Sequence, residues 1–188
     1  MSDLLAEIGR VQREAELLHS EQVVQAALKR LAESINKRLV GSNPLVVCVM
    51  TGGLVPTGWL LPMLNFPLQL DYIHATRYRE GTRGHDLEWR IRPRIPVHAR
   101  TVLLVDDIYD EGVTLTQIVD DCRKQGAHQV FTAVLIRKQR MHNGRQPNFV
   151  GLEAPDRYLF GCGLDYKNYL RNLSAVYAIP DDFDKDGI

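Results

Sequence analysis

Cysteine, net charge and long apolar runs are all scarce in this sequence, and each shortage excludes a class of protein. The three cysteines, Cys48, Cys122 and Cys162, are widely spaced and form no Cys-x-x-Cys pair. An odd, scattered set of this kind is typical of buried, reduced thiols, so we expect a cytosolic protein. The 23 basic and 23 acidic side chains give a formal net charge of zero. That balance argues against nucleic acid as a partner, because surfaces that bind nucleic acid carry an excess of positive charge.

No apolar run has the length that a membrane protein needs. Runs such as Leu45–Met50 are far shorter than the ~20 residues of a membrane-spanning helix. Asp3 and Glu7 also interrupt the region in which a secretory signal would begin its apolar segment. We therefore expect neither a membrane partner nor an export signal.

Several motifs of common enzyme classes are missing as well. Gly53 and Gly58 have the spacing of a P-loop, but Trp59 and Leu60 stand where that loop requires Lys and Ser or Thr. No Gly-x-Gly-x-x-Gly, His-Glu-x-x-His or Gly-x-Ser-x-Gly sequence occurs, and the six histidines show no clear metal-ligand spacing. The chemistry of this chain must therefore be sought elsewhere.

The first forty residues have the pattern of two amphipathic helices. Apolar residues recur at three- and four-residue spacing from Leu4 to Leu18, and again from Val24 to Leu39 beyond a possible Ser20 cap. Packing against a core explains such faces better than a binding role does.

Three continuous apolar runs follow, at Leu45–Met50, Val102–Val105 and Val130–Ile136. Runs without polar alternation are typical of strands that are buried on both faces of a parallel sheet. Between the last two runs, Val113–Gln125 has one apolar helical face, and Gly126 supplies a stop. This order predicts an α/β fold with an open, mostly parallel sheet flanked by helices. We expect the core of one domain, residues 1–188, to cover about residues 40–140.

The segment from Leu68 to Pro96 alternates between apolar and polar residues, which predicts two half-exposed strands. The apolar positions are Leu68, Leu70 and Tyr72, and then Leu87, Trp89 and Ile91. The polar connection Arg77–Asp86 between them suits an exposed hairpin loop and a mobile lid over a site equally well.

Each apolar run ends in an unusual polar stretch. Thr51-Gly52-Gly53 follows the first run, Asp106-Asp107 the second and Arg137-Lys138 the third. Ligands bind at the carboxyl ends of the strands in open parallel sheets, so the three stretches predict one shared site.

The acidic stretch after the second run carries the strongest signal. Two adjacent carboxylates at the end of a strand repel each other unless a cation or a polyhydroxyl ligand shares them. The preference of helix N-termini for acids explains Asp110 and Glu111, but it does not explain Asp106-Asp107. Gly112 permits a tight turn, and the amides of the helix that follows favour a phosphate.

The stretch from Val102 to Leu115, VLLVDDIYDEGVTL, resembles the phosphoribosyl pyrophosphate signature of type I phosphoribosyltransferases. Phe149–Tyr158, together with Gly161, Leu164-Asp165-Tyr166 and Arg171, is similar to the hypoxanthine/guanine branch of that family. The resemblance extends from about Leu45 to Leu173. It implies a magnesium-dependent enzyme of purine salvage that joins a 6-oxopurine base to phosphoribosyl pyrophosphate, releasing the nucleotide monophosphate and pyrophosphate.

The resemblance also implies roles for the residues around the ribose and the phosphates. Asp106 and Asp107 would hold the ribose hydroxyls, directly or through Mg²⁺, and Asp165 would bind a second Mg²⁺. Thr51-Gly52 would form the pyrophosphate loop, where the family often holds a non-proline cis peptide, and Arg171 would contact the pyrophosphate. The 5′-phosphate would lie in the loop made of Asp110, Glu111, Gly112, Val113 and Thr114.

For the purine, the resemblance implies a catalytic acid/base group, Asp110, beside N7. Lys138 would donate to the 6-oxo oxygen, Tyr158 would stack on the ring, and the backbone near Leu159 and Asp165 would read the base edge. A lid of about residues 74–92, with Arg77 and Tyr78, would close the site. A hood subdomain would comprise the N-terminal helices and about residues 145–180, and the family implies a homodimer or a homotetramer.

Three residues depart from the family pattern. Asp106 stands where many members carry Glu, and Thr51 replaces a basic residue that is common in some relatives. Glu111 occupies a position of the phosphate loop that Ser or Thr often fills. Because its carboxylate cannot face a phosphate, we expect the Glu111 side chain to point outward while its backbone amide serves the loop.

Three other readings stay open from the sequence. The chain could be a xanthine-preferring enzyme, or a non-catalytic nucleotide-binding regulator on the same fold. Its neutral charge argues against RNA binding by such a regulator. A receiver-like signalling domain would need a phosphoacceptor Asp at the end of a separate strand, and no other apolar run supplies one.

Overall fold

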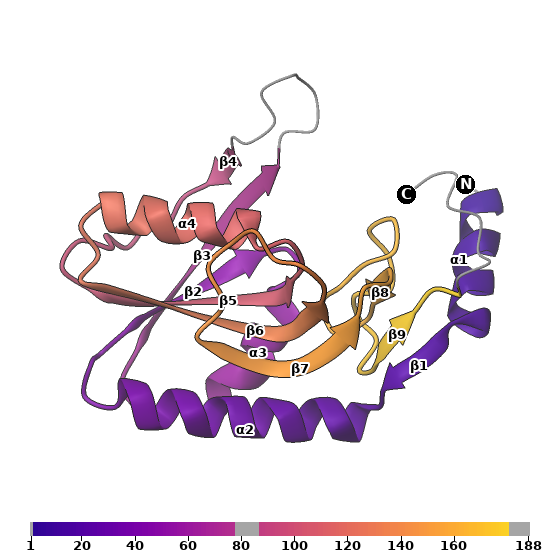
Figure 1. The fold of residues 1–188 in the computed structure, drawn as a ribbon, viewed down its shortest axis with the longest axis horizontal. Coiled ribbons are helices and arrows are strands. Elements are labelled where there is room, and N and C mark those ends of the chain that lie inside the picture. The colour runs from indigo at the N-terminus through magenta and orange to yellow at the C-terminus, as the bar shows by residue number, and fades with distance from the viewer. Residues whose placement is uncertain (1, 78–86, 181–188) are drawn as a thin grey trace.

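A six-stranded sheet forms the centre of the fold (Figure 1). The computed structural model describes residues 2–77 and 87–180. In spatial order the strands are β4 (Leu87–Ile91), β3 (Gln69–Arg77), β2 (Leu45–Met50), β5 (Thr101–Tyr109), β6 (Gln129–Gln139) and β7 (Phe149–Pro155). All neighbours are parallel except β3 and β4, which are antiparallel. The predicted α/β fold with an open, mostly parallel sheet is confirmed.

Helices cover both faces of this sheet. Helix α4 (Val113–Lys124) lies on one face, while α2 (Glu21–Leu39) and the short α3 (Leu54–Leu60) lie on the other, where the 3-10 turn η1 (Leu61–Met63) follows α3 (Figure 1). Val102 and Leu104 of β5 pack in the cluster under α4, whereas Leu103 and Val105 pack in the cluster under α2. This alternation explains why the central strands are apolar at every position. No helix of the described residues is both long and apolar enough to cross a membrane.

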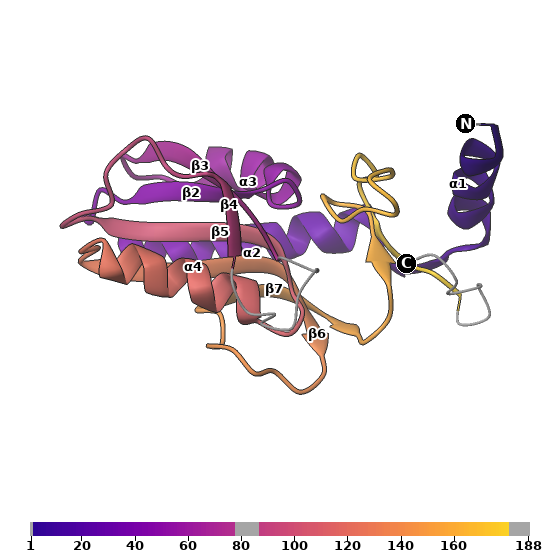
Figure 2. The same cartoon turned by 90° about the horizontal axis from the view of Figure 1, so that it is seen from above.

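A second, three-stranded sheet forms a hood beyond the carboxyl ends of the central strands (Figure 1). Its order is β1 (Glu16–His19), β9 (Val176–Ala178) and β8 (Leu159–Phe160), and all pairs are antiparallel. Helix α1 (Ser2–Glu14) packs on it at the end of the molecule away from the main sheet (Figure 2). A separate apolar cluster joins them, made of Ile8, Val11, Phe160, Tyr166, Leu170 and Ile179.

The hood is smaller than the sequence predicts. Strand β7 is the edge strand of the main sheet and does not belong to the hood. Helix α2 belongs to the hood only in part, because its second half packs on the main sheet, while Val24 and Leu28 pack with β9. The prediction that the first helix extends to Leu18 is also wrong. Helix α1 ends at Glu14, and Glu16–His19 pairs with β9 as a strand. Hydrogen bonds to a segment some 160 residues away in sequence override the local helical spacing here.

Other local signals are confirmed. The Ser20 hydroxyl accepts a hydrogen bond from the Val23 amide and caps α2. Gly126, after α4, has the left-handed conformation that ends helices, with φ +83°. All three cysteines are buried free thiols, as their spacing predicts. Of the predicted lid, residues 78–86 lie outside the described residues, so that prediction stays untested.

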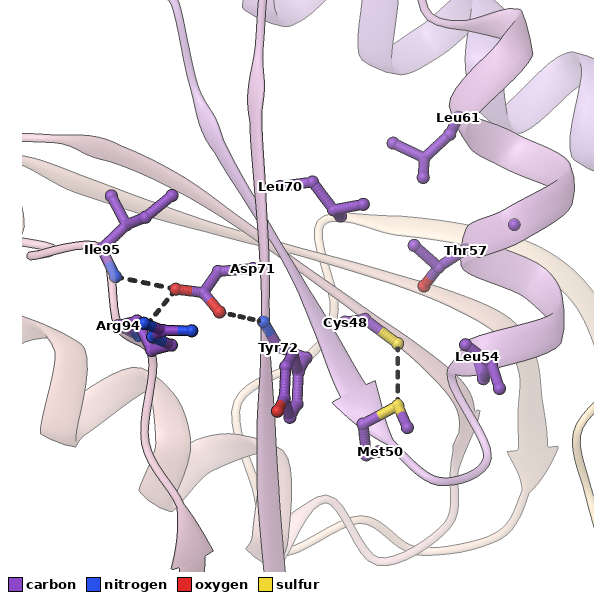
Figure 3. A pocket seen from close by; sticks show the side chains of 11 residues that line it. Cys48, Met50, Leu54, Thr57, Leu61, Leu70, Asp71, Tyr72, Arg94 and Ile95 are labelled. Carbon is purple, nitrogen blue, oxygen red and sulfur yellow. Dashed lines mark hydrogen bonds between the residues drawn. The ribbon is translucent and has the colours of Figure 1, made fainter.

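The half-exposed strand at residues 69–77 is confirmed, but its faces are the reverse of those expected. Asp71 is buried, while Leu70 and Tyr72 are exposed at the surface (Figure 3). The Asp71 carboxylate accepts hydrogen bonds of 2.7–2.8 Å from the amides of Tyr72, Arg94 and Ile95. These three bonds compensate the burial of the carboxylate and fix the chain that returns from β4.

Candidate active site

The polar stretches of β2, β5 and β6 meet at the edge of the main sheet that faces the hood (Figure 1). Strands β5 and β6 are longer than their apolar runs, because their pairing continues through Ile108–Ile136 and Tyr109–Arg137. Asp106 and Asp107 therefore lie within β5, and Lys138 lies within β6, rather than in loops after the strands. Rigid strands thus hold the groups that the sequence assigned to strand ends.

The turn after β2 lies against β5 because it contains two glycines. A methyl group on Gly53 would overlap backbone carbonyl groups of β2 and β5, and one on Gly52 would overlap the Asp107 carboxylate. The peptide bond between Met50 and Thr51 is cis, so the loop expected to hold a non-proline cis peptide does contain one. The turn consequently presents the backbone of Thr51-Gly52 directly beside Asp107.

Asp106 and Asp107 form a crowded acidic pair. The Asp107 amide donates to Asp106 Oδ1 at 2.9 Å, and the Ile108 amide donates to Asp107 Oδ1 at 2.8 Å. Burial raises the pKa of Asp106 well above the ordinary carboxyl range, and the charge of Asp107 raises it further. Burial also raises the pKa of Asp107, although hydrogen bonds and the positive charge of Arg171 oppose that shift. The pair is short of positive charge, so it suits a cation or the hydroxyl groups of a ligand.

The hood approaches the same turn from the opposite side. Gly163 has φ +103°, and a methyl group there would overlap the Gly52 carbonyl oxygen. Arg171 Nη1 donates to the Gly163 carbonyl at 2.7 Å, and Arg171 Nη2 lies 2.7 Å from Asp165 Oδ1. Asp165 Oδ2 accepts the Asn168 amide at 2.7 Å. The structure thereby brings Asp165 and Arg171 to the side of the site that Gly52 forms.

A second cluster of charges surrounds Asp110. Lys138 Nζ lies 3.1 Å from Asp110 Oδ2, and Arg140 Nη1 lies 2.9 Å from Asp110 Oδ1. Asp156 Oδ1 is 3.5 Å from Lys138 Nζ and 3.4 Å from Arg140 Nη1. Arg137 turns to the other face of β6, where it pairs with Glu153. Of the stretch Arg137-Lys138, only Lys138 therefore joins the site.

The loop between β5 and α4 is shaped for an anion. Gly112 is the residue before α4 and has the left-handed φ of +81°, and a methyl group there would overlap the Tyr109 ring. Val113 and Thr114 begin the helix, and no acidic residue occupies its first turn. The free amides of a helix N-terminus and its dipole favour a phosphate at this position. The Glu111 carboxylate lies 3.8 Å from Arg140 Nη2.

The remaining predicted residues lie at the borders of the site. The Tyr158 ring meets the Tyr166 ring edge-on in the hood, with centroids 5.9 Å apart. Leu159 begins β8 and is buried with Ile136 and Ala154. Arg77 is the last residue of β3, and Tyr78 lies outside the described residues.

Sequence reasoning missed two residues of the Asp110 cluster, Arg140 and Asp156. Arg140 lies two positions after Lys138, in a turn directly after β6 where its amide donates to the Lys138 carbonyl at 3.1 Å. Its closeness in sequence to Lys138 was the available signal for Arg140. Asp156 lies inside a stretch that carries the family resemblance, but nothing in its spacing singles it out.

Comparisons with known proteins agree with this geometry. A family model described as phosphoribosyl transferase domain matches residues 15–166. The hypoxanthine-guanine phosphoribosyltransferase of Aquifex aeolicus (strain VF5) is 28% identical over 172 residues, which cover 90% of this chain and 97% of that protein. The protein of the same name from Bacillus subtilis (strain 168) is 29% identical over 166 residues, which cover 85% of this chain and 90% of that protein.

Solved structures share the fold. A hypoxanthine phosphoribosyltransferase from Staphylococcus aureus has a TM-score of 0.85 at 23% identity, with 90% of this chain and 94% of that chain covered. A hypoxanthine-guanine-xanthine phosphoribosyltransferase has a TM-score of 0.80 at 25% identity, with 88% and 97% covered.

The acidic pair predicts a pH-dependent stability. Because the raised pKa of Asp106 means that the folded state binds this proton more tightly than the unfolded chain, its contribution is complete below the ordinary carboxyl pKa. It is lost as the pH rises through the raised value. Without divalent cations, Asp106→Asn should therefore stabilise the protein at pH 8 by on the order of 1 kcal/mol, and by less at pH 5. Urea unfolding at both pH values measures this.

The matched control is Asp120→Asn, which changes an exposed acid of α4 and should leave the stability within about 0.5 kcal/mol of the wild type at both pH values. An Asp106→Asn protein that is less stable than the wild type at pH 8 would show that other groups already neutralise the negative charge of Asp106 and Asp107.

The contact of Gly163 with Gly52 gives a second prediction. Gly163→Ala should destabilise the protein by about 2 kcal/mol, because alanine is strained at positive φ and its methyl group meets a carbonyl oxygen. Gly9→Ala in α1 is the control, since its methyl group meets the flexible end of the Arg13 side chain at 3.3 Å and should be neutral or slightly stabilising. Equal unfolding midpoints for the two variants would contradict the close contact.

Proposed function

The chain belongs to the phosphoribosyl transferase domain family, and from this premise we propose that it is a purine-salvage enzyme that uses hypoxanthine, guanine or both. It would transfer the 5-phosphoribosyl group from phosphoribosyl pyrophosphate to the base, giving IMP or GMP and pyrophosphate. The contact of Asp110 with Lys138, at 3.1 Å beside the phosphate loop, is the observation that carries this proposal.

The ribose and the 5′-phosphate would bind along β5 and the start of α4. The amides from Glu111 to Thr114, the left-handed turn at Gly112 and the Thr114 hydroxyl would hold the phosphate. Asp106 and Asp107 would accept hydrogen bonds from the ribose hydroxyls, which relieves the mutual repulsion of the two buried acids.

The pyrophosphate would lie between the Thr51-Gly52 backbone and Arg171. Carboxylate oxygens of Asp107 and Asp165 are suitable ligands for Mg²⁺, which typically takes its remaining ligands from substrate phosphates and water. That expectation fits the described residues, among which no cluster of three or more His, Cys, Asp or Glu side chains could hold a metal alone. Bound Mg²⁺ would neutralise the charge that develops on the leaving pyrophosphate. Arg171, held by Gly163 and Asp165, would add a fixed positive charge on the same side.

The base would bind between Lys138 and the hood. Lys138 is a hydrogen-bond donor, so it selects the 6-oxo oxygen of hypoxanthine or guanine over the 6-amino group of adenine. Asp110 would exchange a proton with N7 as the acid/base group, since its Oδ2 lies beside Lys138 Nζ. Tyr158 would stack on the ring, the backbone near Leu159 and Asp165 would contact its edge, and a lid that includes Arg77 and Tyr78 would exclude water.

The direct test is pyrophosphate release with Mg²⁺, phosphoribosyl pyrophosphate and each of hypoxanthine, guanine, xanthine and adenine. We expect release with hypoxanthine, guanine or both. Release with adenine alone would refute the role of Lys138, and a preference for xanthine would move the specificity to that base. No release with any base, combined with salt-sensitive RNA binding, would favour a non-catalytic regulator.

Asp110→Asn should lower kcat about 100-fold or more, because an amide cannot exchange the N7 proton, a step that contributes roughly 100- to 10,000-fold in other enzymes. The Kd for phosphoribosyl pyrophosphate should change less than about threefold, since the phosphate contacts are to backbone amides. Titration calorimetry and steady-state kinetics measure the two quantities. Near-normal turnover would remove Asp110 from the acid/base role.

We also propose that the chain forms a homodimer through the groove between α3 and β3, with a homotetramer as a dimer of these dimers. The groove measures about 560 Å³, and large apolar side chains line it, including Leu54 and Leu70, which are 52% and 50% exposed (Figure 3). Exposed apolar patches on this scale are typical of interfaces.

The buried free thiols support the expected cytosolic location.

Sedimentation velocity tests the dimer. Leu70→Asp should dissociate the dimer into monomers, because it places a charge in the apolar groove. Glu33→Asp, on the exposed side of α2, is the control that should leave the assembly unchanged. A Leu70→Asp protein that sediments like the wild type would show that this groove is not the interface.

A further inference from the structure

Arg140 has no role in the function proposed above, yet its guanidinium lies among three carboxylates of the site. Its Nη1 atom is 2.9 Å from Asp110 Oδ1 and 3.4 Å from Asp156 Oδ1, and its Nη2 atom is 3.8 Å from Glu111 Oε1. Lys138 contacts the other oxygen of Asp110, Oδ2, and is only 12% exposed. The Asp110 carboxylate is thus held by one cation on each oxygen.

The two cations cannot keep equal roles when a base binds. If Lys138 turns to the 6-oxo oxygen of the purine, Oδ2 of Asp110 loses its partner and becomes free to face N7. Oδ1 keeps its contact with Arg140, because Arg140 lies on the other side of the carboxylate. We propose that Arg140 is a positioning residue that holds Asp110 through Oδ1 and so aims Oδ2 at the base.

The chain that carries Arg140 is fastened to the phosphate loop, which makes this contact rigid. The Asn143 amide donates to the Glu111 carbonyl at 3.2 Å, and the Arg145 amide donates to Thr116 Oγ1 at 2.9 Å. Gly144 lies so close to the Gly112 carbonyl that a methyl group on it would overlap that carbonyl. The segment 140–145 therefore moves with the loop that contains Asp110, and the guanidinium stays in place relative to the carboxylate.

The same geometry gives Glu111 a function. A guanidinium can donate to several acceptors at once, and acceptors on different sides fix its orientation. Asp156 accepts a hydrogen bond from Arg140 Nη1 at 3.4 Å, and the Glu111 carboxylate lies 3.8 Å from Nη2, so these two carboxylates help to orient Arg140. Glu111, which departs from the family pattern in the phosphate loop, thus helps to orient Arg140, and Arg140 in turn holds Asp110.

Removal of Arg140 should leave Asp110 and Asp156 with Lys138 as the cation that contacts both of them. When Lys138 turns to the base, mutual repulsion would then rotate Asp110 away from N7. Arg140→Met keeps the length and the apolar stem of the side chain. We expect it to lower kcat about 10- to 100-fold while the KM for phosphoribosyl pyrophosphate changes less than about threefold.

A double-mutant cycle with Asp110→Asn is the decisive test, because a residue that acts through Asp110 has little left to do when Asp110 is replaced. In the Asp110→Asn background, Arg140→Met should change kcat less than about threefold. Arg140→Lys, which keeps the charge, should recover part of the loss. Arg145→Met is the control: its side chain pairs with Asp120 on α4, so kcat should stay near that of the wild type.

The stoichiometry of phosphoribosyl pyrophosphate binding and the unfolding midpoint are measured for each variant, so that a folding defect is separated from a kinetic one. A normal kcat in Arg140→Met, or a full multiplicative loss in the Asp110→Asn background, would overturn the proposal. If Arg140→Met does not fold, the double-mutant cycle is measured with Arg140→Lys instead. Losses of kcat that multiply in the double variant would overturn the proposal in that case too.

This inference rests on the proposed function, but the two fail differently. A wild-type protein without transferase activity would remove the proposed function, and an active Asp110→Asn protein would remove the acid/base role of Asp110. Only the role of Arg140 would be removed if the wild type is active, Asp110→Asn is nearly inactive, and the loss of kcat from Arg140→Met multiplies with that of Asp110→Asn.

Discussion

The pairing of β5 with β6 beyond their apolar segments is the constraint on which the rest of the site depends. The parallel register continues to Tyr109 and Arg137, so the backbone is already fixed where the first charged side chains appear. Asp106 and Asp107 are held in the strand, Asp110 follows directly after its end, and Lys138 projects from the neighbouring strand. Charged groups on strands have less freedom than groups on loops, which suits a reaction that depends on the placement of charge.

The charges of the site divide into two clusters, each with more acids than bases. On one side, Asp165 and Arg171 neutralise each other beside the turn that Gly52 forms, while Asp106 and Asp107 remain short of positive charge. On the other side, Lys138 and Arg140 face Asp110, Asp156 and Glu111. In the proposed function, a cation and the ribose hydroxyls would relieve the repulsion in the first cluster, and a base would take Lys138 from Asp110 in the second.

Features determined by nearby residues could be predicted from the sequence. The Ser20 cap, the helix stop at Gly126 and the buried strands all depend on residues within one element or its immediate flank. The acidic stretch around Asp106 could be found for the same reason, since its signature is continuous in sequence.

Features determined by distant partners could not be predicted. Leu70 and Tyr72 face outward because Asp71 receives amides from residues 94 and 95, more than twenty positions away. Glu16–His19 is a strand because it pairs with β9, and Arg140 joins the site because β6 continues past its apolar run. The pairing of Asp110 with two cations likewise depends on the register of two strands rather than on either segment alone.

The pairing of β1 with β9 also determines the order in which the protein can be assembled. Strand β1 is synthesised before the main sheet, while its neighbour in the described hood sheet is made of residues 176–178, which follow the main sheet. The main sheet, complete at Pro155, can form while the ribosome is still adding the remainder. Throughout that interval Ile8 and Val11, which are buried in the finished hood, have no partner to cover them. Helix α1 is thus synthesised before the main sheet but packed after it, so its apolar face stays uncovered in the nascent chain.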